Sequence, residues 1–180
     1  MDVFNKEEDA GVEFYDARVS EGELGLYQGC IEYLLKTAGP EAVLLSTGCT
    51  EDQLRAYCDQ FRQLLLENAH PEFLMDRLRR EVEIEQSRAG VEVLKIEETG
   101  SVCLFDLRFS EAELKLIERC IDYVLNTCGE EEQITWWTDC ESSEELEVLY
   151  EYVLRAIRNH VDPDYLPDRP LKQFDEEDDY

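Results

Sequence analysis

The sequence repeats itself at a spacing of ninety residues, and this repeat limits the possible folds more than any other feature. When residues 2–39 are shifted onto residues 92–129, 17 of the 38 aligned pairs are identical. With a drift of two residues, the match resumes at residues 71–74 and 163–166. Two copies are too few for a stacked array of repeats. A single unit of roughly eighty residues has a thin hydrophobic core, so we expect two units that share one core across a pseudo-two-fold axis.

The apolar pattern predicts the same β-β-α-β-α order in both units. Each unit begins with a hairpin whose longer strand alternates between an apolar set and a mixed set of residues, which places the two sets on opposite faces of a sheet. The predicted hairpin strands cover residues 2–5 and 12–19 in the first unit, and 91–97 and 102–109 in the second. A further short strand is predicted in each unit, at residues 42–46 and 133–137.

Helix boundaries are marked by capping signals. Polar residues that can cap a helix, followed three positions later by Glu or Gln, predict the helix starts; these residues are Ser20, Thr50, Ser110 and Ser142. Gly39 and Gly129 stand where a left-handed residue would end the first helix of each unit.

These patterns predict an α+β fold made of two layers, a mostly antiparallel sheet and helices over one of its faces. The first repeat covers residues 1–77 and the second covers residues 91–169. Residues 78–90 predict a charged connector helix between them. Residues 170–180 form an acidic block of the kind that is usually a disordered interaction tail.

The chain has 44 acidic and 17 basic residues and a net charge of −27. This charge disfavours nucleic acids and anionic membranes as direct partners, because both are polyanions. It favours a basic protein partner, since opposite charge steers association and complements the interface. Solubility, or adaptation to high salt, is the alternative explanation of the charge.

The seven cysteines form no CxxC pair, so we expect reduced and mostly buried thiols in a reducing compartment. No apolar run approaches the ~20 residues that a membrane-spanning helix needs. The N-terminal residues lack the basic start and apolar core of a signal peptide. These features predict a cytoplasmic protein, with a disulfide-bonded secreted protein as the alternative.

The sequence contains no recognisable catalytic motif. His70 and His160 lie just before the proline breaks, without a nucleophile at a known motif spacing. Cys49 and Cys140 precede predicted helices, where a thiol can become a nucleophile. However, acidic neighbours oppose thiolate formation at both positions. We therefore expect no enzymatic activity, no cofactor and no bound metal.

Each unit places a carboxylate and a guanidinium on the mixed face of its long strand, as Asp16 with Arg18 and as Asp106 with Arg108. A solvated ion pair at the end of a strand would contribute little to stability. The alternatives are a polar patch at the interface between the units, or a face that binds a partner.

Residues 120–154 contain ten acidic residues and no lysine, arginine or histidine. Trp136 and Trp137 lie within this stretch, whereas Leu45 and Ser46 fall near the matching positions of the first unit. Aromatic residues among acids of one sign are typical of an interface hot spot with steering charges. The alternative is that one tryptophan packs inward and the acids are merely solvated. The predicted partner-binding residues are Trp136, Trp137, Asp139, Glu141, Glu144, Glu145, Glu147, Glu151, Asp16 and Asp106.

Together, these features predict a non-enzymatic acidic module that blocks or escorts a basic protein, such as a nuclease, a toxin or another nucleic-acid-binding protein. Inhibitors, immunity proteins and DNA mimics of this kind are linked by charge, not by a shared motif. One alternative is a small-ligand sensing or regulatory domain with a pocket at the repeat interface. The other is an enzyme that uses Cys49 or Cys140.

Overall fold

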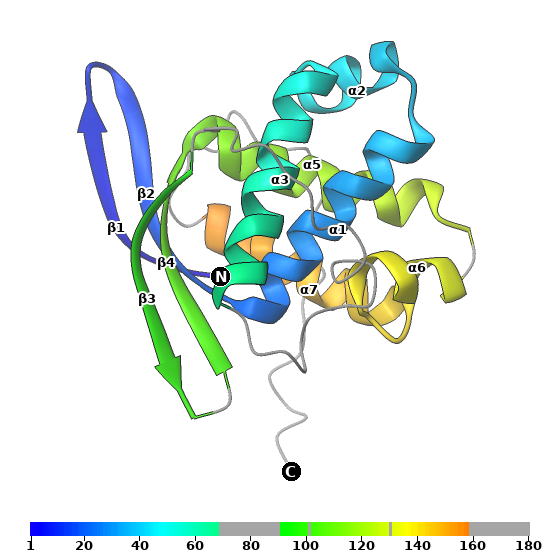
Figure 1. Ribbon diagram of the computed structural model, residues 1–180. Helices are drawn as coiled ribbons and strands as arrows, with labels where there is room; N and C mark the ends of the chain where they lie inside the picture. Colours follow the sequence, from blue (N-terminus) through cyan, green and yellow to red (C-terminus); the bar gives the residue numbers. More distant parts are fainter. Residues whose placement is uncertain (69–90, 101, 130, 159–180) are drawn as a thin grey trace.

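The computed structural model describes residues 1–68, 91–100, 102–129 and 131–158. These residues form an α+β structure in which helices cover one face of a four-stranded antiparallel sheet (Figure 1). The expected α+β class and the separate sheet and helix layers are therefore confirmed.

The same order of elements occurs before and after the gap at residues 69–90. The first half contains β1 (Asp2–Asp9), β2 (Val12–Ser20), α1 (Glu21–Thr37), α2 (Pro40–Thr47) and α3 (Glu51–Asn68). The second half contains β3 (Glu92–Thr99), β4 (Val102–Ser110), α5 (Glu111–Thr127), α6 (Glu131–Thr138) and α7 (Ser143–Arg158). The described part of each half is therefore β-β-α-α-α.

The predicted third strand of each half is wrong, because both segments are short helices, α2 and α6. Pro40 stands in the first turn of α2, where its fixed φ and missing N–H suit a helix start. Val43 and Thr47 are buried at a spacing of four residues, which is the period of a helix and not of a strand. A short apolar run such as residues 42–45 does not distinguish the two structures by itself.

The left-handed residue was also predicted at the wrong glycine. Gly39 has φ −77° and is the N-cap of α2, and Gly129 also lacks a positive φ. The left-handed conformation instead follows the short helices, at Gly48 (φ 75°) and Asp139 (φ 63°). The left-handed residue therefore comes one helix later than predicted.

The capping signals are better predictors. Ser20 and Ser110 form complete capping boxes with Glu23 and Glu113. Thr50 caps α3 in the same reciprocal way with Gln53. At α7 the Ser142 hydroxyl accepts from the Glu145 amide, but the Glu145 carboxylate accepts from the amide of Glu141 instead of that of Ser142.

The sheet order is β1-β2-β4-β3, so the long strands of the two hairpins pair in the centre. Ala17 lies opposite Leu107, which is its own match under the ninety-residue shift. The edge strands each contain an irregularity at matching places, between Val3 and Asn5 and between Val93 and Lys95. Such bulges discourage further pairing at exposed sheet edges.

One cluster of buried side chains draws on both halves of the chain. The predicted apolar sets of the central strands face the helices and are fully buried: Tyr15, Ala17, Val19, Phe105, Leu107 and Phe109. Helix α1 packs against α3, α5 and α6, whereas α5 packs against α2 and α7. The short helix of each half therefore packs on the long first helix of the other half.

Several predicted features lie outside the described residues. They are the connector helix at 78–90, the acidic tail at 170–180, and His70 and His160. Among the described helices, none is long and apolar enough to cross a membrane.

Candidate functional site

The predicted partner-binding residues fall on two separate regions of the fold, the central strands and the α6–α7 segment. Asp16 and Asp106 lie on the central strands, on the sheet face that the described helices do not cover. The others belong to α6, to α7 and to the loop between them.

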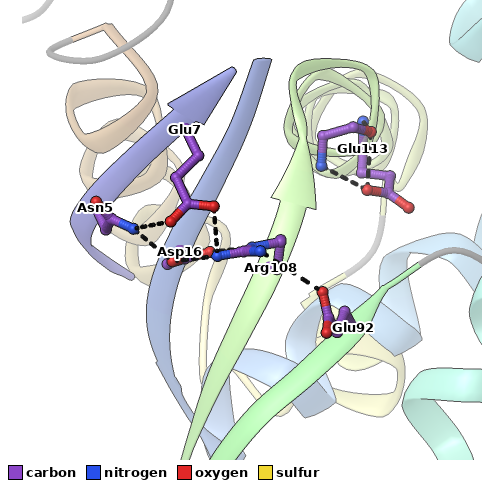
Figure 2. A network of polar contacts seen from close by, with 7 residues as sticks. Asn5, Glu7, Asp16, Glu92, Arg108 and Glu113 are labelled. Carbon is purple, nitrogen blue, oxygen red and sulfur yellow. Dashed lines mark hydrogen bonds and ion pairs between the residues drawn. The ribbon is translucent and has the colours of Figure 1, made fainter. Parts of the chain in front are cut away.

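Asp16 and Asp106 are each bound by an arginine from the other half of the chain. Arg108 donates from Nε (2.6 Å) and Nη2 (2.9 Å) to the two carboxylate oxygens of Asp16 (Figure 2). Arg18 donates in the same way to Asp106, at 2.6 Å and 2.8 Å. Each pair is bidentate, the geometry that gives arginine–carboxylate contacts their directionality.

Further polar groups surround each of these pairs. The Asn5 amide donates to Asp16 at 2.8 Å, and Glu7 of β1 lies 3.1 Å from Arg108 (Figure 2). Glu92 of β3 approaches the same guanidinium at 3.9 Å. On the other side, Arg18 also contacts Glu97 of β3 at 3.0 Å. The network therefore extends across all four strands.

Electrostatics indicate what this network can do. Hydrogen bonds from Arg108 hold the pKa of Asp16 below its ordinary value, and those from Arg18 do the same to the pKa of Asp106. Both carboxylates are thus ionised but already paired. This geometry fits a polar patch that joins the two halves better than a solvated ion pair or a partner-binding face.

Trp136 and Trp137 point in different directions. Trp136 is 50% exposed. Trp137 is only partly exposed and packs edge-on against Tyr33 of α1, with 6.0 Å between ring centroids. Lys36 Nζ lies 4.7 Å from the centroid of Trp137, and Tyr33 also contacts its match in the repeat, Tyr123. Trp137 therefore fixes α6 on α1, and Trp136 is left to face solvent.

The exposed side of α7 combines acids with large apolar residues. Val148 and Tyr152 are 49% and 64% exposed, and Glu144 lies one helical turn before Val148. The opposite side of α7 is buried, and its Tyr150 hydroxyl donates to the Glu118 carboxylate at 2.6 Å. The helix is therefore held firmly while its outer face remains open.

We define the α6–α7 surface as the exposed residues Trp136, Asp139, Glu141, Glu144, Glu145, Glu147, Val148 and Tyr152. Glu151 is half-buried at its margin. The sequence interpretation missed Val148 and Tyr152. Their apolar character at a spacing of four residues, outside the buried stripe of α7, was the signal that could have identified them.

Carboxylates engage most of the basic side chains that the structure describes. The pairs are Lys6–Glu13, Arg18–Asp106, Lys36–Glu32, Arg55–Glu51, Arg62–Glu32, Lys95–Glu97, Arg108–Asp16 and Lys115–Glu111. The α6–α7 surface as defined contains five acids and no basic residue, and the exposed Arg155 lies on α7 one helical turn beyond Tyr152.

The cysteines are free thiols, and six of the seven are buried. Burial raises the pKa of Cys140 to about 11 and also raises the pKa of Cys49. A thiol that stays protonated near neutral pH is a poor nucleophile. Within the described ranges, no group of three or more His, Cys, Asp or Glu side chains is arranged to hold a metal ion.

Comparison with known proteins gave no match: no protein-family model fits the chain, and no curated protein or solved structure resembles it significantly.

Proposed function

We propose that this chain is a non-enzymatic acidic module that binds a basic protein through the α6–α7 surface and thereby blocks or escorts it. The main support is the half-exposed Trp136 on α6, a helix that Trp137 fixes on α1. The neighbouring helix α7 adds an outer face on which acids are mixed with Val148 and Tyr152. Large apolar anchors supply binding energy, and the surrounding acids raise the association rate.

The proposal gives the paired aspartates of the sheet a different role from the one predicted. Asp16 and Asp106 join the halves and do not contact the partner, because their carboxylates are occupied by Arg108 and Arg18. A cytoplasmic location is part of the proposal, and the free thiols support it.

We also infer that the chain is an internal duplication with a pseudo-two-fold axis. Three kinds of matching pairs meet each other: Ala17 with Leu107 in the sheet, Tyr33 with Tyr123 between helices, and the two reciprocal ion pairs. In an antiparallel pair, a residue that faces its own counterpart is expected where a two-fold axis passes.

The test begins with capture of partners from cell lysate at low and high salt, followed by surface-plasmon kinetics with the captured basic protein. Glu144→Lys with Glu147→Lys should slow association and reduce its salt dependence, because exposed charges act mainly on the on-rate. Glu8→Lys with Asp9→Lys makes the same change of charge at the tip of the first hairpin and serves as the matched control.

Trp136→Ala should instead speed dissociation, by roughly thirtyfold if the side chain contributes about 2 kcal/mol as a hot spot. Phe4→Ala removes another half-exposed aromatic residue, on β1, and should leave dissociation unchanged. Deletion of residues 175–180 should have a weaker, salt-sensitive effect. If salt and all of these variants leave binding unaltered, the charge serves only solubility and the proposal fails.

A further inference from the structure

Helices α2 and α6 match residue by residue under a shift of 91 positions. Val43 and Thr47 are buried in α2, as Ile134 and Thr138 are in α6. Each threonine hydroxyl donates to the carbonyl four residues earlier at 2.7 Å and accepts from the amide of the cysteine that follows two positions later. The two helices are therefore held in the same way.

Both short helices carry a large exposed apolar side chain at the same position, and we call this exposed part the tip of each helix. Leu45 of α2 matches Trp136 of α6 and is 78% exposed. Leu44, next to it, is 50% exposed. Two neighbouring leucines on an eight-residue helix thus face solvent where the other half presents its tryptophan.

The two tips belong to separate parts of the surface. Helix α2 packs on α5 and α3, whereas α6 packs on α1 and α7, and Figure 1 shows α2 and α6 on different sides of the α1–α5 pair. A protein bound at one helix would therefore leave the other helix accessible.

The charged side chains around α2 include exposed acids, but they are sparser than those around α6 and are accompanied by arginines. Glu41 of α2 and Asp52 in the first turn of α3 are exposed, whereas Glu51 is paired with Arg55 at 2.8 Å. Arg119 also approaches the end of α2, because its Nη1 lies 3.5 Å from where a Cβ on Gly48 would be. A basic protein would find an apolar anchor here with a weaker steering field.

We propose that the α2 tip, Leu44 and Leu45, is a second and weaker docking site for another molecule of the same basic partner. This inference rests on the proposed function of the α6–α7 surface. The chain then binds two partner molecules, one at each short helix, with less salt dependence at α2 because fewer acids surround it.

The test uses the full chain and a synthetic probe, an 18-residue amphipathic helix of leucine and lysine. A scrambled peptide of the same composition reports binding by charge alone. Native mass spectrometry and titration calorimetry should find two probe molecules per chain, of unequal affinity. The scrambled peptide should show no saturable second site.

Leu44→Ser with Leu45→Ser should weaken the lower-affinity site by about tenfold or more and leave the tighter site intact. Trp136→Ser should do the reverse, and Phe4→Ser is the matched control that should retain both sites. Because these side chains are exposed, thermal unfolding should be unchanged, which separates loss of binding from loss of fold.

Three results would contradict the inference in distinguishable ways. A single site that only Trp136→Ser removes overturns the second site and leaves the proposed function standing. Two sites whose affinities are unchanged by the leucine substitutions would place the second probe molecule elsewhere, and this result would also overturn the inference. No saturable binding of the amphipathic probe at either helix contradicts the inference and the proposed function together.

Discussion

Two different residues, a glycine after α2 and an aspartate after α6, adopt the same left-handed backbone conformation. Gly48 adopts φ 75° and Asp139 adopts φ 63° at matching positions. Glycine has no Cβ and accepts this region freely, whereas an L-residue with a side chain pays a steric cost there. Aspartate is among the residues that tolerate it best. The choice of aspartate in the second half adds an acid to the α6–α7 surface at some cost in stability.

Asp139→Gly should therefore stabilise the protein by about 1 kcal/mol while it removes one steering charge. Urea unfolding of the full chain measures the first effect, and the association rate with the captured partner measures the second. Gly48→Asp is the matched control and should destabilise by a similar amount. An unchanged or lower free energy of unfolding for Asp139→Gly would mean that the aspartate side chain makes stabilising contacts that offset the backbone cost.

At the scale of elements, β2 and β4 are joined by backbone pairing and by the two reciprocal ion pairs. The pKa of Asp16 and that of Asp106 are lower in the folded chain than their ordinary values. A carboxyl with a lowered folded pKa contributes stability above its unfolded pKa, about 3.9 for aspartate. That contribution is lost as the pH falls through the folded pKa.

Asp16→Asn with Asp106→Asn should consequently lower stability at neutral pH and flatten its decline on acidification below about pH 4. Urea unfolding at a series of pH values from 7 to 3 measures both effects. Asp9→Asn with Asp52→Asn, at two exposed positions, is the matched control and should keep the parent's dependence. Equal acid sensitivity in the parent and in the variant with Asp16→Asn and Asp106→Asn would show that these ion pairs do not set the acid sensitivity.

A charge exchange tests whether the paired geometry itself matters. Asp16→Arg with Arg108→Asp keeps the composition and reverses one pair, so it should recover much of the stability that either single change loses. The Arg18–Asp106 pair stays intact in the same molecule and provides an internal reference. No coupling between the two substitutions would contradict the assignment of this pair as a link between the strands.

At the scale of the whole molecule, the two halves depend on each other for burial. Leu107 of β4 lies opposite Ala17 of β2, and Trp137 of α6 packs against Tyr33 of α1. Helix α2 in turn packs on α5. Separation of the halves would expose the apolar surfaces that now form one core.

Residues 1–88 expressed alone should therefore not unfold as a stable monomer at the temperature of the full chain. Either the fragment is unfolded or it self-associates, because Asp16 and Arg18 of one copy complement those of another. Circular dichroism melting with light scattering distinguishes these states. Addition of residues 89–180 should restore a cooperative transition. A monomeric fragment that melts like the full chain would show that the first half has a sufficient core of its own.

The sequence by itself determined those features that depend on residues within one or two turns of each other. The hairpins, the alternation of the central strands and the capping boxes at Ser20 and Ser110 follow from such local signals, and the structure contains them. The first hairpin differs in extent, because β1 continues to Asp9 where the predicted strand ended at residue 5. The surplus of acids is likewise a property of composition, and it is the basis of the proposed basic partner.

Only the tertiary structure decided how these elements meet. Residues 42–46 are helical because Val43 and Thr47 turn one helical face toward the core, and a short apolar run does not specify that choice. Trp136 is exposed because Trp137 is held by Tyr33 and Lys36, which lie a hundred residues away in the sequence. Asp16 is occupied because antiparallel pairing of β2 with β4 brings Arg108 opposite it. A local pattern can predict which face of a strand is buried, but the exposure of Trp136 and the partner of Asp16 depend on which distant segments come into contact.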